Sequence, residues 1–171
     1  IDVQIAAVRT LGQMSTPEAN AALSTALDSP FPSIRAEAAL ALGRRGVRAA
    51  VPRIRALLED HEPVVISAAL DALAWLRADS VAASVERALG HYDDEVFQAG
   101  LRAARTLSHA TALRSLSKGV EHSAWNVRML ATKLVLEIDS DGSRELLKRA
   151  LANEADAMVR HAIESGLQKG A

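Results

Sequence analysis

SIRAEAALALG, at residues 33–43, is the stretch of sequence that decides the fold of this chain. Its larger apolar residues and alanines recur at spacings of three to five positions, which places them on one face of a helix. Glycine closes the stretch, and a second apolar segment containing Ile54 and Leu58 follows after a short break. The pattern predicts two short helices joined by a tight turn.

The same pattern returns along the whole chain when the sequence is shifted by 31 residues against itself. Repeats of this length indicate stacked units, none of which can bury its apolar face alone. Two columns of the expected second helices are apolar in every copy. They are Leu23, Ile54, Val85, Leu116 and Leu147, and, four residues on, Leu27, Leu58, Leu89, Val120 and Leu151. The matching column of the first helices is Val3, Ile34, Val65, Val96, Val127 and Val159. We therefore predict helix pairs whose apolar faces join into one core.

Composition agrees with closely packed helices. Apolar residues make up 49% of the 171 residues but aromatics only 3%, whereas a β-sandwich would need more aromatic and β-branched residues. The formal net charge of −1 produces no global attraction to nucleic acid or to an anionic membrane. The lack of cysteine excludes disulfides and thiolate metal sites. No apolar run approaches the roughly 18 residues of a membrane span, and no signal-peptide pattern is visible.

The segment at residues 33–43, with Ala50-Val51-Pro52-Arg53-Ile54 and Leu57-Leu58 after it, resembles the HEAT family, in particular its short bacterial form related to phycobilisome-lyase HEAT-like repeats. The resemblance covers the whole chain and implies an all-α fold, an α-solenoid with a right-handed superhelix. In this family an arginine after the first apolar residue commonly pairs with an acidic residue of the turn between repeats. This arginine is present as Arg35, Arg128 and Arg160 and replaced by Gln4, Ile66 and Phe97.

We expect about five and a half helical hairpins in a single array. The repeats lie near residues 1–31, 32–62, 63–93, 94–124 and 125–157, and a terminal helix covers residues 158–171. The chain begins at Ile1 rather than Met and opens directly into a helical pattern, so it could be an excised piece of a larger protein. We expect that protein to be bacterial and cytoplasmic.

The resemblance implies that the second helices line the concave side of the solenoid, where partners usually dock. Basic residues recur on the expected outer face of these helices. They are Arg55, Arg87, Arg114, Lys118, Lys148 and Arg149. Such a stripe could hold an acidic peptide or phosphate groups. The alternative is a solvated surface, because the cations lie in the latter part of their helices and have acidic neighbours one turn away.

The aromatic and apolar residues near the turns are a second candidate interface. The set consists of Ile66, Phe97, Trp75 and Trp125. If exposed, these side chains form an apolar ridge typical of protein interfaces; if tucked under the turns, they replace the packing of the lost arginines. A cluster of five arginines between Arg44 and Arg55 could touch phosphates, but DNA binding usually needs a broader positive field.

Metal sites and catalysis find little support in the sequence. The stretch from Asp139 to Ser143 has the start of a calcium loop, but Lys148 stands where the closing glutamate is required, so we expect a turn with Asp141 or Ser143 capping a helix. The single His61-Glu62 dyad lacks the repeated His-Glu pairs of the HEAT-like enzyme deoxyhypusine hydroxylase. No phosphate loop, nucleophile elbow or triad spacing appears. We predict no cofactor, no metal and no enzymatic activity.

The leading functional hypothesis is therefore a scaffold that binds a partner protein or peptide on its concave face. The resemblance to phycobilin lyase subunits implies an alternative, a tetrapyrrole-handling role in which Arg87 or Lys118 contacts the propionates. A third hypothesis is a nucleic-acid reader similar to the HEAT-like alkylpurine DNA glycosylases, although the face of this chain carries Glu86 and Glu145.

Overall fold

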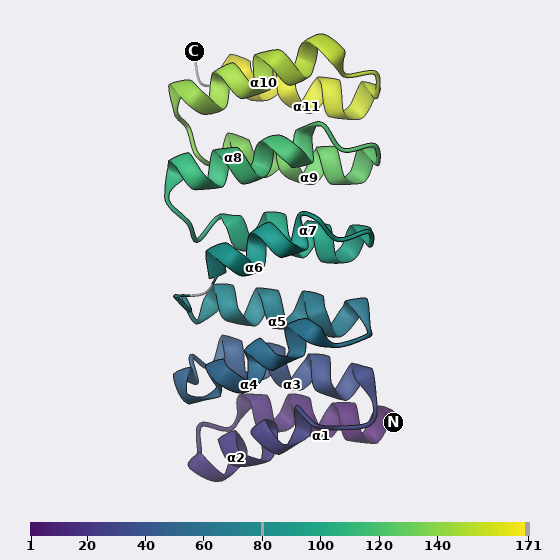
Figure 1. Cartoon of the computed structure of the whole chain (residues 1–171), viewed down its shortest axis with the longest axis vertical. Helices are drawn as coiled ribbons and strands as arrows, with labels where there is room; N and C mark the ends of the chain where they lie inside the picture. Colours follow the sequence, from purple (N-terminus) through teal and green to yellow (C-terminus); the bar gives the residue numbers. More distant parts are fainter. Residues whose placement is uncertain (80, 170–171) are drawn as a thin grey trace. The chain divides into compact units, whose positions relative to one another are not determined.

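The computed structural model describes residues 1–79 and 81–169, and the described residues form helices and turns without a strand. The helices come in pairs, as the 31-residue period predicts, and the all-α repeat fold is confirmed (Figure 1). Their bounds are α1 Asp2–Gln13, α2 Pro17–Ala26, α3 Pro32–Arg44, α4 Val51–Ala56, α5 Pro63–Trp75, α6 Val81–Ala88, α7 Asp94–Ala104, α8 His109–Val120, α9 Trp125–Leu136, α10 Asp141–Asn153 and α11 Ala157–Lys169. Two 3₁₀ turns, η1 Arg48–Ala50 and η2 Leu57–Glu59, flank α4.

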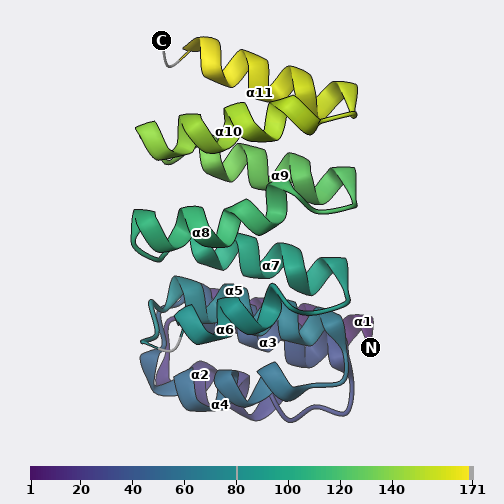
Figure 2. The same ribbon diagram turned by 45° about the horizontal axis from the view of Figure 1, so that its top comes forward.

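The chain divides into two compact units, residues 1–103 and 104–171, with the boundary at the end of α7. In the first unit α3 packs between α1 and α5, and the second helices α2 and α4 lie along one side of them (Figure 2). In the second unit α9 packs against α8 and α11, and α10 contacts α8, α9 and α11. The expected terminal helix is α11, whose last two predicted residues lie outside the described range. The single array stays a prediction.

Local signals in the sequence start and stop these helices. Pro17, Pro32 and Pro63 occupy the first helical position of α2, α3 and α5, where a missing N–H is not needed for the helix. The Thr16 hydroxyl accepts a hydrogen bond from the N–H of Ala19 and caps α2. At the end of α3, Gly46 adopts a left-handed φ of +70°, which lets the chain turn sharply into the next helix.

The repeated apolar columns form the core. Leu23, Ile54, Val85, Leu116 and Leu147 are all buried, one from each second helix. Close approach of the first helices is possible because small residues line the contact: a Cβ atom at Gly43 of α3 would lie 2.7 Å from the Cα atom of Ala72 in α5. Val3 departs from its column and is exposed.

Candidate functional site

The inter-repeat turns are fastened where the first helix supplies an arginine at the position after its first apolar residue, here called the ladder position. Arg35 donates two hydrogen bonds of 2.8 Å from Nε and NH2 to the two carboxylate oxygens of Asp60. Its NH1 atom donates to the carbonyl oxygen of Ser29, in the turn just before α3. Both charged side chains are largely buried, so this bidentate pair ties α3 to the turn that follows its own hairpin.

The second unit contains the same arrangement in the turn between α10 and α11. Arg128 donates hydrogen bonds of 2.8 and 2.9 Å to the carboxylate of Glu154, whose side chain is only 3% exposed. Arg128 also donates to the carbonyl oxygens of His122 and Ser123. Arg160, at the next ladder position, donates to the carbonyl oxygen of Glu154. The three arginines that match the family pattern are thus all bonded to the inter-repeat turns.

Both fastened carboxylates are held in the charged state. Burial acts to raise the pKa of Asp60, but hydrogen bonds from Arg35 and from the backbone N–H of Glu62 outweigh it, and the pKa lies below its ordinary value. The hydrogen bonds from Arg128 lower the pKa of Glu154 despite its burial, with further help from the backbone N–H of Asp156. The pKa values of Arg35 and Arg128 are raised by the same pairs.

The ladder changes at Ile66, where an apolar residue replaces the arginine. The residue of the turn also changes, because His91 stands where Asp60 stands one repeat earlier. Nδ1 of His91 accepts a 3.1 Å hydrogen bond from the backbone N–H of Asp93, as Oδ1 of Asp60 accepts one of 3.0 Å from the N–H of Glu62. The turn therefore keeps its local hydrogen bond but loses the long cation that reached it from the first helix.

A groove of about 250 Å³ opens at this replaced position and is called the Ile66 groove. Its apolar lining comes from η2, α5, α6 and α7, and its polar lining from the two flanking turns and α6. The apolar residues are Leu58, Ile66, Leu70, Ala88 and Val96, and the polar ones are Glu59, Asp60, Ser84, Arg87 and His91. The groove brings together Ile66 and Arg87, which the sequence placed in two different candidate surfaces.

Two other grooves occupy the same place in their repeats. One, of about 470 Å³, is lined by Gln4, Val8, Thr25 and Ile34 among others and lies in the first unit. The other, called the Arg149 groove, has a volume of about 850 Å³ and lies in the second unit between the ends of α8 and α10. Its lining includes Val120, His122, Leu146 and Arg149.

The six predicted cations all lie on second helices. In the first unit Arg55 is exposed on α4, and Arg87 on α6 forms an ion pair with Glu59. In the second unit the others lie on the contacting helices α8 and α10. These are Arg114, which donates to the hydroxyl of Thr111, and the exposed Lys118, Lys148 and Arg149. Arg149 lines the Arg149 groove, and Arg87 lines the Ile66 groove.

The four residues of the possible apolar ridge differ in their exposure. Phe97 is buried and takes no part in an exposed surface, and Ile66 is half-buried in its groove. Trp75 ends α5 and exposes 49% of its surface, with the guanidinium carbon of Arg44 5.8 Å from the ring centroid. Trp125 begins α9 in the other unit and exposes 47%. Each apolar side chain is thus in a different local setting, because residues near turns do not follow the helical period.

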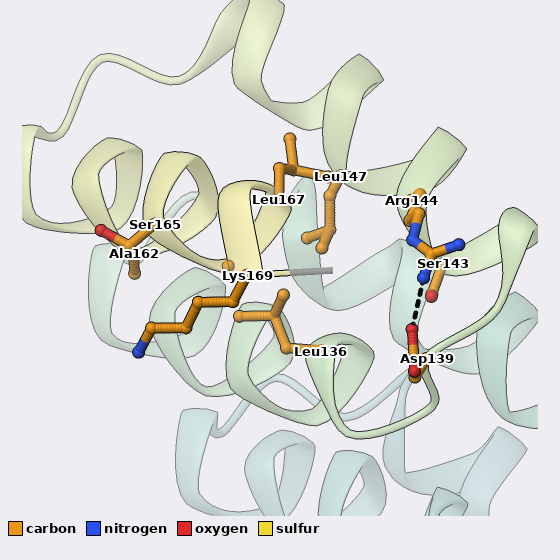
Figure 3. Close-up of a pocket in the computed structure, with 10 residues that line it drawn as sticks. Leu136, Asp139, Ser143, Arg144, Leu147, Ala162, Ser165, Leu167 and Lys169 are labelled. Carbon is orange, nitrogen blue, oxygen red and sulfur yellow. Dashed lines mark hydrogen bonds and ion pairs between the residues drawn. The ribbon is translucent and has the colours of Figure 1, made fainter. Parts of the chain in front are cut away.

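A pocket of about 380 Å³ lies near the end of the second unit, between α9, α10 and α11 (Figure 3). Leu136, Leu147 and Leu167 point toward it, and Arg144 and Asp139 form a 2.7 Å ion pair at its side. The turn before α10, whose sequence has the start of a calcium loop, forms a capping box. Here Ser140 rather than Asp141 is the N-cap, since Ser140 and Ser143 each accept the other's backbone N–H.

No group of three or more histidine and acidic side chains within residues 1–79 and 81–169 could hold a metal ion. None of the helices described in this range has the length and apolar content needed to cross a membrane. The feature that the sequence did not predict is the groove lined by both Ile66 and His91. Its signal was present, because the ladder column and the turn column change in the same repeat.

Stacked helical hairpins with bidentate Arg–carboxylate pairs at their turns define a helical-repeat protein. The profile of HEAT repeats matches residues 1–74, 21–105 and 81–168, so the chain belongs to the HEAT-repeat family. No curated protein sequence matches the chain.

Solved structures of repeat proteins are similar in fold. The complex of CpcE and CpcF of phycocyanin lyase from Nostoc sp. PCC7120 aligns with a TM-score of 0.57 and 20% identity over 96% of this chain and 73% of that chain. A designed armadillo repeat protein in complex with the peptide (KR)4 aligns with a TM-score of 0.64 and 17% identity over 97% and 92%. An engineered protein aligns with a TM-score of 0.65 and 18% identity over 99% and 92%.

Proposed function

We propose that this chain is a non-enzymatic scaffold that binds a partner protein or peptide on the surface of its second helices. The observation that carries the proposal is that grooves recur at one repeat position along this surface, each beside exposed cations or mixed charges. Grooves with apolar floors and polar rims are typical of binding sites. The peptide held by a designed armadillo repeat protein of similar fold supports this reading.

The cations of the second helices are the part of this surface that can be tested directly. The chain is immobilised and used to capture proteins from the source cell, beside a variant with Arg87, Lys118 and Arg149 changed to glutamate. A matched control reverses three cations outside the second helices, Arg9 of α1, Lys133 of α9 and Arg105 in the turn after α7. We expect the first variant to lose captured partners that the control retains, because reversed charges repel a complementary partner. Equal capture by all three proteins contradicts a binding role for the cations.

The Arg149 groove supports a second candidate, the handling of a tetrapyrrole. Its volume of about 850 Å³ lies within the range of small-molecule sites, and Arg149 supplies a cation for a propionate. The fold similarity to the phycocyanin lyase complex favours the same class of ligand. Visible absorbance that copurifies with the chain, or that shifts when bilin is added, supports this role. A colourless protein whose addition leaves the bilin spectrum unchanged contradicts it.

A further inference from the structure

The residue at the ladder position lines the grooves beside the second helices, because Gln4, Ile66 and Arg128 each line one of them. In the first unit the grooves at Gln4 and at Ile66 are equivalent, since their lining residues are related by a shift of 62 residues, or two repeats. The position between them holds Arg35, which is bonded to Asp60. The Arg149 groove of the second unit has an arginine at this position, Arg128, which is bonded to Glu154. What distinguishes the Ile66 groove is that its ladder residue is apolar.

The Ile66 groove has the size for one side chain rather than for a cofactor. Its volume of about 250 Å³ is below the range of roughly 300–1,000 Å³ that is usual for small-molecule sites. Its floor is aliphatic, because Ile66 and Leu70 of α5 and Val96 of α7 face the space between η2 and α6. An aliphatic side chain that entered this groove would leave water for an apolar surface on several sides.

The charge around the groove favours particular residues on either side of such a side chain in the partner sequence. The two turns that flank it, residues 59–63 and 91–95, contain six carboxylates and neither lysine nor arginine. Arg35 reaches Asp60, and Arg87 reaches Glu59, and neither arginine belongs to these two turns. Glu62 and Glu95 are exposed and follow groove-lining residues by two and four positions. The rim therefore has a surplus of negative charge.

We propose that the Ile66 groove binds one aliphatic side chain of a partner peptide whose neighbouring residues are lysine or arginine. The proposal rests on the scaffold function above and adds a basic segment of the partner at this repeat, distinct from the segment that faces the cations of the second helices. The apolar floor accounts for the anchor residue, and the acidic turns account for its basic neighbours.

The test uses synthetic peptides and the whole chain labelled with ¹⁵N. The reference peptide has one leucine between two lysine–arginine pairs, and two variants replace leucine by glycine or the basic residues by glutamate. We expect amide shifts at Ile66, Leu70 and Val96, an affinity at least about tenfold weaker for the glycine peptide, and no binding of the glutamate peptide. Added salt should weaken the reference complex, since exposed charges are screened. Equal binding of the glutamate peptide, or shifts confined to the hairpin tip near Trp75, overturns the proposal.

Two variants of the protein separate the groove from the surface charge. Ile66→Arg combined with His91→Asp places the pair seen at Arg35 and Asp60 in this repeat, should replace the apolar side chain of the floor by a charged pair, and should abolish the shifts. Glu62→Lys combined with Glu95→Lys changes only exposed residues, keeps the fold, and should weaken binding about tenfold. Its matched control is Glu18→Lys with Glu164→Lys, which should bind as the wild type does. Wild-type affinity in either groove variant overturns the proposal.

A second copy of the chain is the remaining occupant to test. Shifts at Ile66 that appear without peptide and grow with protein concentration, together with dimerisation in sedimentation, would assign the groove to self-association and overturn the proposal. The scaffold function is tested separately. If a groove variant loses peptide binding but still captures partners, the scaffold function stands and the groove proposal fails. If the cation variant loses no partners but the peptide still binds, the scaffold function fails and the groove proposal stands.

Discussion

The turns that begin at Asp60 and at His91 have the same local hydrogen bond to the backbone but differ in whether an arginine of the first helix is bonded to them. In each, a side-chain acceptor takes the N–H two residues ahead, from Glu62 or from Asp93. At Asp60 the acceptor is also held by Arg35, whereas at His91 the ladder position carries Ile66 and a groove lies between them. The comparison teaches that the local shape of the turn and its tie to the first helix are separate features. A repeat can give up the tie without losing the turn.

The largest effect should come from breaking the tie at Arg35. Arg35→Ala leaves the largely buried Asp60 carboxylate without its cation, and we expect the free energy of unfolding to fall by about 3 kcal/mol. Urea denaturation monitored by circular dichroism measures the loss. The control is Arg53→Ala, whose ion pair with Asp28 is exposed and should contribute less than about 0.5 kcal/mol. Similar losses in both variants would show that burial of the pair is unimportant.

Building the tie where it is missing should have the next largest effect. Ile66→Arg alone places a charge in a groove without its carboxylate, and His91→Asp alone adds a negative charge to an acidic turn. We expect each change to destabilise the chain and the double variant to recover, with a coupling energy of about 2 kcal/mol. A double-mutant cycle in urea measures the coupling. Additive losses would mean that the Arg35 geometry does not transfer to this repeat.

The fastened turns should also make stability depend on acid. The pKa values of Asp60 and Glu154 are lowered in the folded chain, so both carboxylates stabilise it above their unfolded pKa values. This contribution is lost as the pH falls below about 4.5 and through the folded pKa values. We expect the stability gap between the wild type and an Arg35→Met, Arg128→Met variant to narrow by more than about 1 kcal/mol between pH 6 and pH 3. Urea unfolding at both pH values measures it, and a constant gap contradicts it.

The smallest effect should come from the turn at His91, where Ile66 replaces the arginine of the first helix. His91→Ala removes the acceptor for the N–H of Asp93, and we expect a loss of about 0.5–1 kcal/mol. His61→Ala, at an exposed position of the other turn, serves as the control and should change stability by less than about 0.5 kcal/mol. Thermal unfolding resolves the two. A His91→Ala variant as stable as the wild type would mean that the turn does not need this acceptor.

Much of the fold was predictable because helical periods repeat five times in one chain. The columns through Leu23 and Ile54 identified core residues correctly, since a buried helical face must be apolar in every copy. The arginines at Arg35 and Arg128 were expected from the family resemblance, and their carboxylate partners are now visible. The residues at the ends of helices were placed less well. The sequence left open whether Phe97 is exposed, and it is buried; Val3 was placed in the core column and is exposed.

The sequence by itself determined that this chain is a series of helical hairpins and which face of each helix is buried. This follows because periodicity and breakers are local properties of the chain. Only the tertiary structure decided what the ladder position does. Ile66 lines a groove together with His91, 25 positions away, and with Arg87 and Ala88 of the neighbouring second helix. Contacts of that range depend on how the hairpins stack, which no local pattern specifies.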